Sequence, residues 1–275
     1  MMRKNKIDPG ILDHLEWLGF VKPVGLVVSA PALVRAGAIL NRRDTEGQCA
    51  LRELIEQRML ETKSGGEDVA LDFEPLARKV LGWSFSPKGF AGTADSPVPE
   101  DLSTQLSEGG PALAPDFAVR ELEPKEGASP WQLLVQVLEP GTEFDKVIES
   151  RNHIELSPQG RMERLLRKTG VSAGLLFNGK SLRLISAPRG ESSGWIDFSI
   201  ADMASTAGRP ICAAMRMLLS QERLLSLPTS KRHPALLDDS RKFQNEVSER
   251  LAEQVLEGLY EFLRGFQAAH DASKG

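Results

Sequence analysis

The sequence has few of the residues that would place it in a specialised class of protein. Only two cysteines occur among the 275 residues, at Cys49 and Cys212. With no CxxC pair and no clustered histidines, this spacing predicts neither a zinc site nor a disulfide framework. We expect two buried thiols in a reducing compartment.

Long apolar runs are also missing. No hydrophobic stretch approaches the roughly 20 residues that a membrane-spanning helix needs. The basic N-terminus lacks the hydrophobic centre of a secretory signal. These absences predict a cytoplasmic protein that has no contact with a membrane.

Neither sign of charge is strongly in excess. The chain has 34 Lys and Arg against 38 Asp and Glu, a formal net charge of −4. It therefore lacks the overall basic character of many nucleic-acid-binding proteins, and any DNA contact must come from a local patch. No HExxH metal motif is present.

What is present points to a mixed α/β core. Residues 131–138 form an apolar run that ends at a Glu-Pro-Gly turn signal, which is typical of a buried strand. Ser157 followed by Pro158 is a typical helix start, and Gly170 is suited to the left-handed helix end. The sequence therefore predicts a strand followed by a helix.

A second strand and a tight hairpin follow. Residues 171–177 are predominantly apolar, and the Asn178-Gly179 pair is a strong signal for a hairpin that leads into a strand at 181–185. A further edge strand is expected at 195–200. Helices are expected before and after this core, at 11–20, 30–40, 48–59, 73–81, 211–219 and 243–266. A brief strand is expected at 24–28.

These elements suggest two parts. We expect an α/β domain over residues 1–200 and a helical connector over 201–275. Residues 93–115 are rich in Pro, Ser, Gly and acidic residues without apolar periodicity, so we expect a mobile surface loop there.

One pair of strands carries residues that suggest nuclease chemistry. Pro115-Asp116 lies on one strand, and Gln136 lies about twenty residues later on the next. A PD-(D/E)xK nuclease core uses such positions to hold Mg²⁺ through oxygen ligands. Its lysine stands two residues after the second ligand, where it can activate the attacking water. Here that position is Leu138, so we expect a PD-(D/E)xK-like mixed sheet whose site is degenerate.

Two alternatives remain open for this site. Glu139 follows the strand and could replace Gln136 as an oxygen donor, and a displaced Lys146 could replace the missing lysine. An active Mg²⁺-dependent endonuclease would use Asp116, either Glu139 or Gln136, and a displaced lysine such as Lys146. Otherwise the sequence predicts no metal site and no cofactor in this chain.

A basic strip is expected on the helix after Ser157. Arg161, Arg164 and Lys168 are spaced i, i+3 and i+7, so they share one helix face. This strip could contact DNA phosphates, and Arg183 and Arg189 could extend it. The plainer interpretation is the solvated side of an amphipathic helix.

With these residues assembled, a family resemblance emerges. It rests on LEWLG at 15–19, PVGLVVSAPAL at 23–33, GLLFNGKSLRL at 174–184, APRGE at 187–191 and GRP at 208–210. In these segments the chain resembles the N-terminal region of large type IIG-like restriction–modification adenine methyltransferases. In particular, it resembles the methylase of class 1 DISARM phage-defence systems.

The resemblance implies more than the residues do. Such proteins carry a nuclease-like N-terminal domain, a helical connector and an AdoMet-dependent N6-adenine methylase domain. This chain has neither an NPPY-type tetrapeptide nor a glycine motif for AdoMet. The resemblance therefore implies a fragment without the methylase domain, with AdoMet expected only in that missing part. DNA and other defence-system subunits are the implied partners. A protein-interaction module that binds through its last apolar helix, without DNA, remains the alternative.

Overall fold

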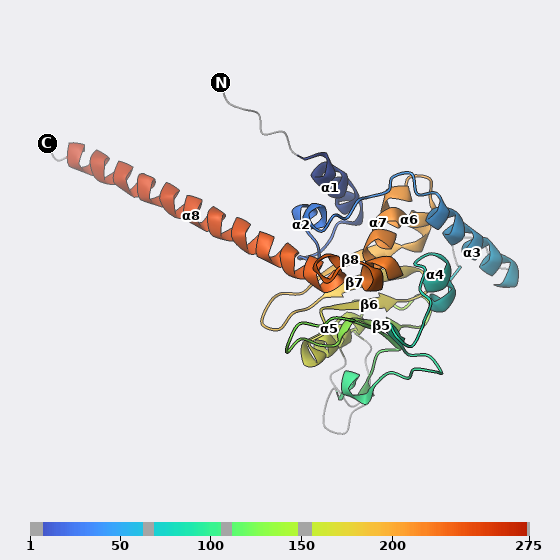
Figure 1. Ribbon diagram of the computed structural model, residues 1–275. Helices are drawn as coiled ribbons and strands as arrows, with labels where there is room; N and C mark the ends of the chain where they lie inside the picture. The colour runs from blue at the N-terminus through green and yellow to red at the C-terminus, as the bar shows by residue number, and fades with distance from the viewer. Residues whose placement is uncertain (1–7, 63–68, 106–111, 148–155, 274–275) are drawn as a thin grey trace.

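The computed structural model describes residues 8–62, 69–105, 112–147 and 156–273. It is a mixed α/β protein built on a six-stranded sheet in the order β1-β4-β5-β6-β7-β8. Helices cover both faces of the sheet, and a long C-terminal helix leaves the body of the molecule (Figure 1). The strands of the sheet are β1 (Phe90–Ala91), β4 (Phe117–Arg120), β5 (Trp131–Val137), β6 (Ala173–Phe177), β7 (Ser181–Ser186) and β8 (Gly194–Ser199).

The predicted strand–helix–strand unit is confirmed. β5 and β6 are the parallel pair, and the other neighbouring strands of the sheet are antiparallel. Parallel strands need a crossover, and α5 (Pro158–Thr169) provides it. The Ser157 hydroxyl accepts a hydrogen bond from the Gly160 amide at 3.2 Å, and Gly170 ends the helix at φ 72°. Both ends of α5 therefore follow the local signals in the sequence.

The predicted hairpin between β6 and β7 is confirmed too. Asn178 Oδ1 accepts hydrogen bonds from the amides of Lys180 at 3.0 Å and Ser181 at 2.8 Å. Gly179 adopts φ 80°, a conformation that side chains rarely tolerate. Strands β6 and β7 then pair antiparallel from Phe177 opposite Leu182.

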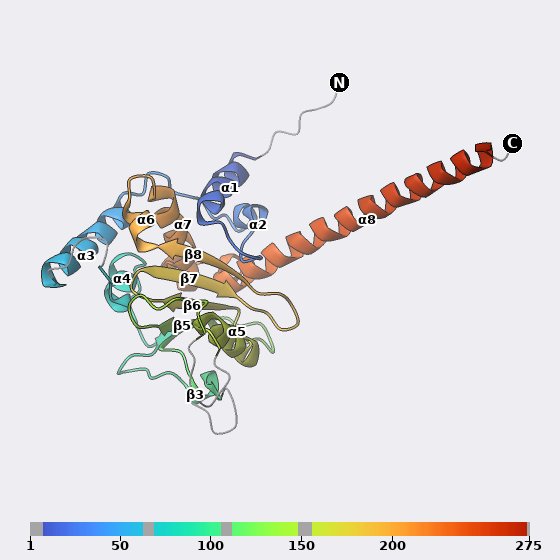
Figure 2. The same cartoon turned by 180° about the vertical axis from the view of Figure 1, so that it is seen from behind.

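The face of the sheet opposite α5 carries the larger core. Trp17, Leu33, Leu51, Leu76 and Met215 are all buried there, between the sheet and the surrounding helices. Figure 2 shows these helices from the other side. They are α1 (Pro9–Val21), α2 (Ala30–Arg35), α3 (Glu46–Thr62), α4 (Phe73–Lys79), α6 (Ile200–Ala204) and α7 (Arg209–Leu219).

This core does not divide at residue 200, where we expected a connector to begin. Met203, Met215 and Leu237 are buried in the same cluster as residues of the first helices. Their side chains complete the layer over the sheet, so residues 201–240 belong to the body of the fold. Only the later part of the last helix stands apart from it.

Three further local expectations need correction. Residues 24–28 do not form a regular strand, because only Val24 pairs, as an isolated bridge to Trp195. The expected loop at 93–115 contains a 3₁₀ turn, η1 (Glu100–Leu102), and the short pair β2 (Thr104–Gln105) and β3 (Ala112–Leu113). Residues 106–111 of that loop lie outside the described part. Cys212 is buried as expected, but Cys49 is exposed because it lies on the outer side of α3.

The last helix, α8 (His233–Ser273), has 41 residues and begins inside the body of the protein. At 1.5 Å per residue it is about 60 Å long. Leu236 and Leu237 are buried, whereas the helix beyond residue 243 projects away from the sheet (Figures 1 and 2). None of the described helices combines the length and apolarity that crossing a lipid bilayer requires.

Candidate functional site

The two strands that carry the nuclease-type residues lie side by side. The Asp116 amide donates to the Val135 carbonyl at 2.8 Å, immediately before β4 pairs with β5. The Asp116 carboxylate turns back and accepts a hydrogen bond from the Val137 amide at 2.6 Å. One carboxylate oxygen is therefore already bound to the end of β5.

Gln136 and Leu138 do not present a catalytic pair. The register places Phe117 opposite Val135, so Asp116 is level with Gln136. The Gln136 Oε1 atom is buried and has no hydrogen-bond partner among the described residues. Leu138 packs against the apolar cluster on the α5 side of the sheet. The position of the nuclease lysine is thus occupied by a side chain that contributes to the core.

A cavity of ≈ 490 Å³ opens beside Asp116. Asp72 and Glu74, at the start of α4, line it together with Asp116. Burial raises the pKa of Asp116, and the hydrogen bond from Val137 only partly offsets that effect. Within the described ranges no three His, Cys, Asp or Glu side chains are arranged to hold a metal ion.

Glu139, the other proposed oxygen donor, points elsewhere. It is exposed in the turn after β5, and its carbonyl accepts hydrogen bonds from the Thr142 amide at 3.1 Å and hydroxyl at 2.7 Å. It does not line the cavity beside Asp116. The arrangement of Asp116, Gln136 and Glu139 does not fit the oxygen shell that Mg²⁺ requires.

The predicted basic strip is formed by α5. Met162, Leu165 and Leu166 are buried against the sheet, while Arg164 and Lys168 are exposed. Arg161 is half-buried, and its Nε donates to the Leu156 carbonyl at 3.1 Å. The outer face of α5 therefore presents two exposed cations one turn apart.

Arg189 has a role that the sequence did not reveal. Its Nη2 donates to the Lys168 carbonyl at 2.7 Å, and its Nε donates to the Arg167 carbonyl. These carbonyls belong to the last turn of α5, where a helix leaves acceptors unsatisfied and its dipole favours a cation. Arg189 thus caps α5 from a distant loop, close to Lys168.

Arg183 is held inside the protein. Its guanidinium makes a two-pronged ion pair with Asp197 at 2.6 and 2.7 Å and a third contact to Asp145 at 2.6 Å. It also donates to Gln159 and lies 4.9 Å from the centre of the Phe144 ring. With its side chain only 6% exposed, Arg183 is directed at protein acceptors and away from solvent.

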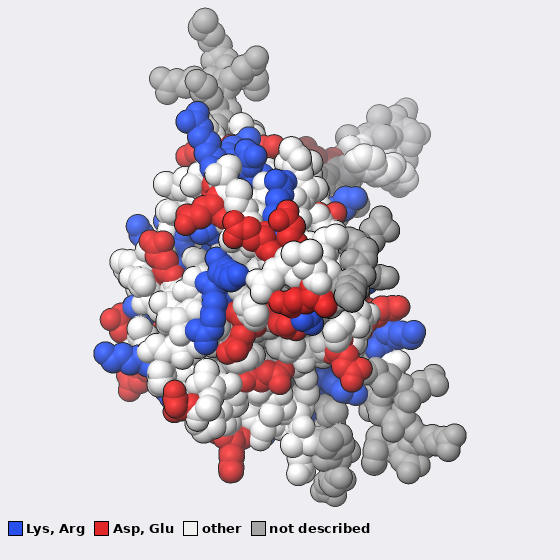
Figure 3. Space-filling model, turned by 90° about the vertical axis from the view of Figure 1, so that its right-hand side faces the viewer, with Lys and Arg blue, Asp and Glu red and all other residues white. Residues whose placement is uncertain are grey.

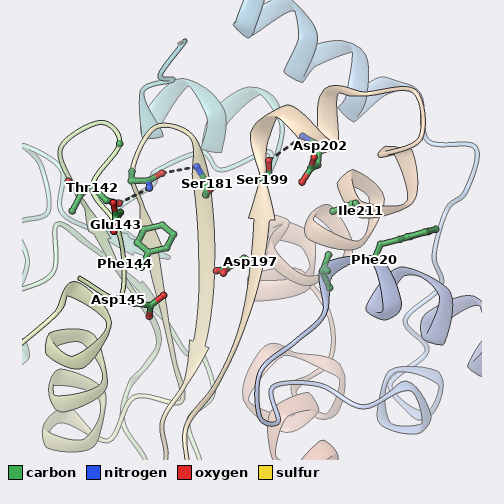
Figure 4. Close-up of a pocket in the computed structure, with 13 residues that line it drawn as sticks. Phe20, Thr142, Glu143, Phe144, Asp145, Ser181, Asp197, Ser199, Asp202 and Ile211 are labelled. Carbon is green, nitrogen blue, oxygen red and sulfur yellow. Dashed lines mark hydrogen bonds between the residues drawn. The ribbon is translucent and has the colours of Figure 1, made fainter. Parts of the chain in front are cut away.

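An acidic cleft of ≈ 430 Å³ is lined by Asp145 and Asp197, the ion-pair partners of Arg183 (Figure 4). Glu143 and Asp145 come from the turn after β5, Asp197 comes from β8, and Asp202 comes from α6. Asp145 and Asp197 are paired with Arg183, so Glu143 and Asp202 leave the cleft negatively charged. Such a charge disfavours the approach of phosphates.

Another face of the molecule has no such concentration of charge. Figure 3 shows basic and acidic side chains interspersed over it, in keeping with the small net charge. A mixed surface gives phosphates little net attraction.

A short serine motif also occurs in the chain. The segment GESSG at residues 190–194 fits the GxSxG pattern of serine hydrolases. That pattern works as a sharp turn between a strand and a helix, which exposes the serine. Here the segment joins β7 to β8, two strands, so Ser192 does not occupy a nucleophile elbow.

No known protein family, curated protein or solved structure matches this chain.

Proposed function

We propose that this chain is a nuclease-like module with a degenerate catalytic site that contributes DNA binding to a larger enzyme. The observation that carries the proposal is the β4–β5 pair. Asp116 is level with Gln136, and Leu138 fills the lysine position with an apolar side chain packed into the core. Such a site retains the position of one ligand but lacks the group that would activate water.

The resemblance noted in the sequence suggests which larger enzyme this is. We propose an AdoMet-dependent DNA N6-adenine methyltransferase of a restriction–modification or phage-defence system, with other defence-system subunits as further partners. Methylase motifs encoded directly downstream of this segment would support the assignment. A downstream sequence of another enzyme class would overturn it.

DNA contact is proposed for the exposed face of α5. Arg164 and Lys168 lie on its outer surface, and Arg161 flanks them. Arg189 stands nearby, but its contacts serve the end of the helix. Arg183 is left out of this strip because its guanidinium is directed at Asp145 and Asp197.

The salt dependence of DNA binding tests this strip. Each lost phosphate contact lowers the slope of log K against log salt by about 0.9 in magnitude. In the double variant Arg164→Ala/Lys168→Ala the magnitude of this slope should therefore fall by about 2, and by the same amount for every DNA sequence. The variant Arg43→Ala/Lys88→Ala removes the same charge from exposed positions outside α5 and serves as the control. Equal losses in both variants, or an unchanged slope, would contradict the strip.

An active Mg²⁺-dependent nuclease remains the second candidate. The observation in its favour is the cavity that Asp116 shares with Asp72 and Glu74. If the site is degenerate, neither the wild type nor Asp116→Ala cuts plasmid DNA in the presence of Mg²⁺ or Mn²⁺. The active nuclease would be established, and the degenerate site overturned, by one pattern of results. The wild type and Glu139→Ala would nick the plasmid, whereas Asp116→Ala would not.

A further inference from the structure

The projecting part of α8 carries an apolar surface that nothing in the described protein covers. Its large hydrophobic side chains are between 48% and 68% exposed. We call this surface the apolar stripe, and it consists of Val247, Leu251, Val255, Leu256, Leu259, Tyr260, Phe262, Leu263 and Phe266. Most members recur at intervals of three or four residues, so they lie along one broad side of the helix.

The size of the stripe is that of a stable interface. Nine half-exposed large side chains offer on the order of 900 Å² of surface, when each retains roughly half of the area that such a residue can bury. Monomeric proteins rarely expose a contiguous apolar patch above about 600 Å². A specific interface buries about 800 Å² on each partner. One further copy of the same stripe would therefore be enough to cover it.

The charged side chains of this part of α8 lie away from the stripe. Glutamates recur along the other side of the helix, whereas Arg250 and Arg264 are the cations described there. Two copies that meet along their stripes therefore leave these charges in solvent. The glutamates concerned are Glu246, Glu249, Glu253, Glu257 and Glu261.

An antiparallel arrangement matches the stripe with itself and keeps the two bodies apart. When the stripe is laid over its own two-fold copy, Val247 becomes level with Phe266 and Leu251 becomes level with Phe262. Each body stands at the start of its own α8, so this arrangement places the two bodies at opposite ends of the pair, whereas a parallel pair would crowd them at one end (Figure 1).

We propose that the apolar stripe is a homodimer interface, in which two α8 helices pair antiparallel about a two-fold axis near residues 256 and 257. Such an interface is closed, because both copies use the same surface. The two sheets lie at opposite ends of the paired helices, so α5 and the β4–β5 site stay accessible in both copies. The proposal is independent of the function assigned to that site.

The mass in solution tests the dimer directly. Sedimentation equilibrium of the full chain should give twice the 30.1 kDa of one copy. Leu251→Glu/Phe262→Glu should raise the dimer dissociation constant by about 100-fold or more, because it places charges at the centre of an apolar interface. Leu60→Glu/Ile39→Glu is the matched control, since both side chains are exposed outside the stripe. A wild-type monomer at all concentrations, or a larger assembly, would overturn the two-fold pairing.

Cysteine cross-linking tests the orientation. In a chain in which the exposed Cys49 is replaced by serine, Val247→Cys mixed with Phe266→Cys should form a disulfide between copies. Val247→Cys alone should not. Cross-linking of Val247→Cys with itself would instead show a parallel pair and overturn the proposal.

Discussion

The two ends of α8 have similar apolar spacing but opposite surroundings. At the start of the helix, His233, Leu237 and Ser240 are each 0% exposed and belong to the core over the sheet. Beyond residue 243, Leu259 and Phe262 are 56% and 68% exposed. Apolar periodicity therefore predicts a helix at both ends, but only the tertiary structure decides which apolar residues are buried by the chain itself.

Truncation of a leucine at each end gives the largest expected contrast. Leu237→Ala should lower the free energy of unfolding by about 3–4 kcal/mol, because it removes buried methyl groups and leaves a cavity. Leu259→Ala should change the stability of the monomer by less than about 0.5 kcal/mol. Urea unfolding of both variants, in the background of a disrupted stripe, measures the difference. Equal losses would mean that the far end of α8 is also packed against the body.

The buried end should also make stability depend on pH. Burial lowers the pKa of His233 from 6.5 to about 4, and the nearby Arg223 adds to the effect. Below pH 6.5 the unfolded chain binds a proton that the folded protein excludes, so stability falls as the pH drops from 6.5 towards 4. The full change is about 3 kcal/mol, at roughly 1.4 kcal/mol for each pKa unit.

Urea unfolding across this pH range measures how much His233 contributes to the loss of stability. Neither ring nitrogen of His233 has a hydrogen-bond partner among the described residues. His233→Leu should therefore flatten much of the acid-side decline without destabilising the protein at pH 8. His14, whose pKa burial also lowers, remains in this variant and should leave a smaller decline. An unchanged pH profile would show that His233 is solvated in the folded state.

The smallest effect concerns one hydroxyl at the buried end. Ser240 Oγ accepts from the Ser29 amide at 3.0 Å and donates to the Leu236 carbonyl at 2.8 Å, which ties α8 to the start of α2. Ser240→Ala should cost about 1–2 kcal/mol, because the Ser29 amide loses its acceptor. Ser248→Ala, on the exposed part of the same helix, should be neutral. A thermal melt of the two variants separates these outcomes.

What the sequence could predict depended on how far apart the interacting residues lie. Ser157, Gly170 and the Asn178-Gly179 pair act through neighbours within four residues, so the ends of α5 and the hairpin were predictable. The adjacency of β4 and β5 was expected from Asp116 and Gln136 on two successive strands, and the two strands pair. Leu138 was expected at the end of this strand, and it directly follows Val137, the last residue of β5.

Arg183 illustrates what could not be predicted. Its partners Asp145 and Asp197 are 38 and 14 residues away in the sequence, and only the folded sheet brings the three together. The cap that Arg189 places on α5 likewise spans 21 residues. In both cases the sequence shows a cation, whereas the contacts that engage it arise from tertiary structure.

The two edges of the sheet have a consequence for how the protein behaves at high concentration. At one edge, β1 is only two residues long. At the other, Val24 exchanges both backbone hydrogen bonds with Trp195 of β8, at 3.0 and 2.8 Å. Exposed strand edges recruit strands from other molecules and so seed aggregates. Because one edge is short and the other is partly occupied, this sheet offers little template for such growth.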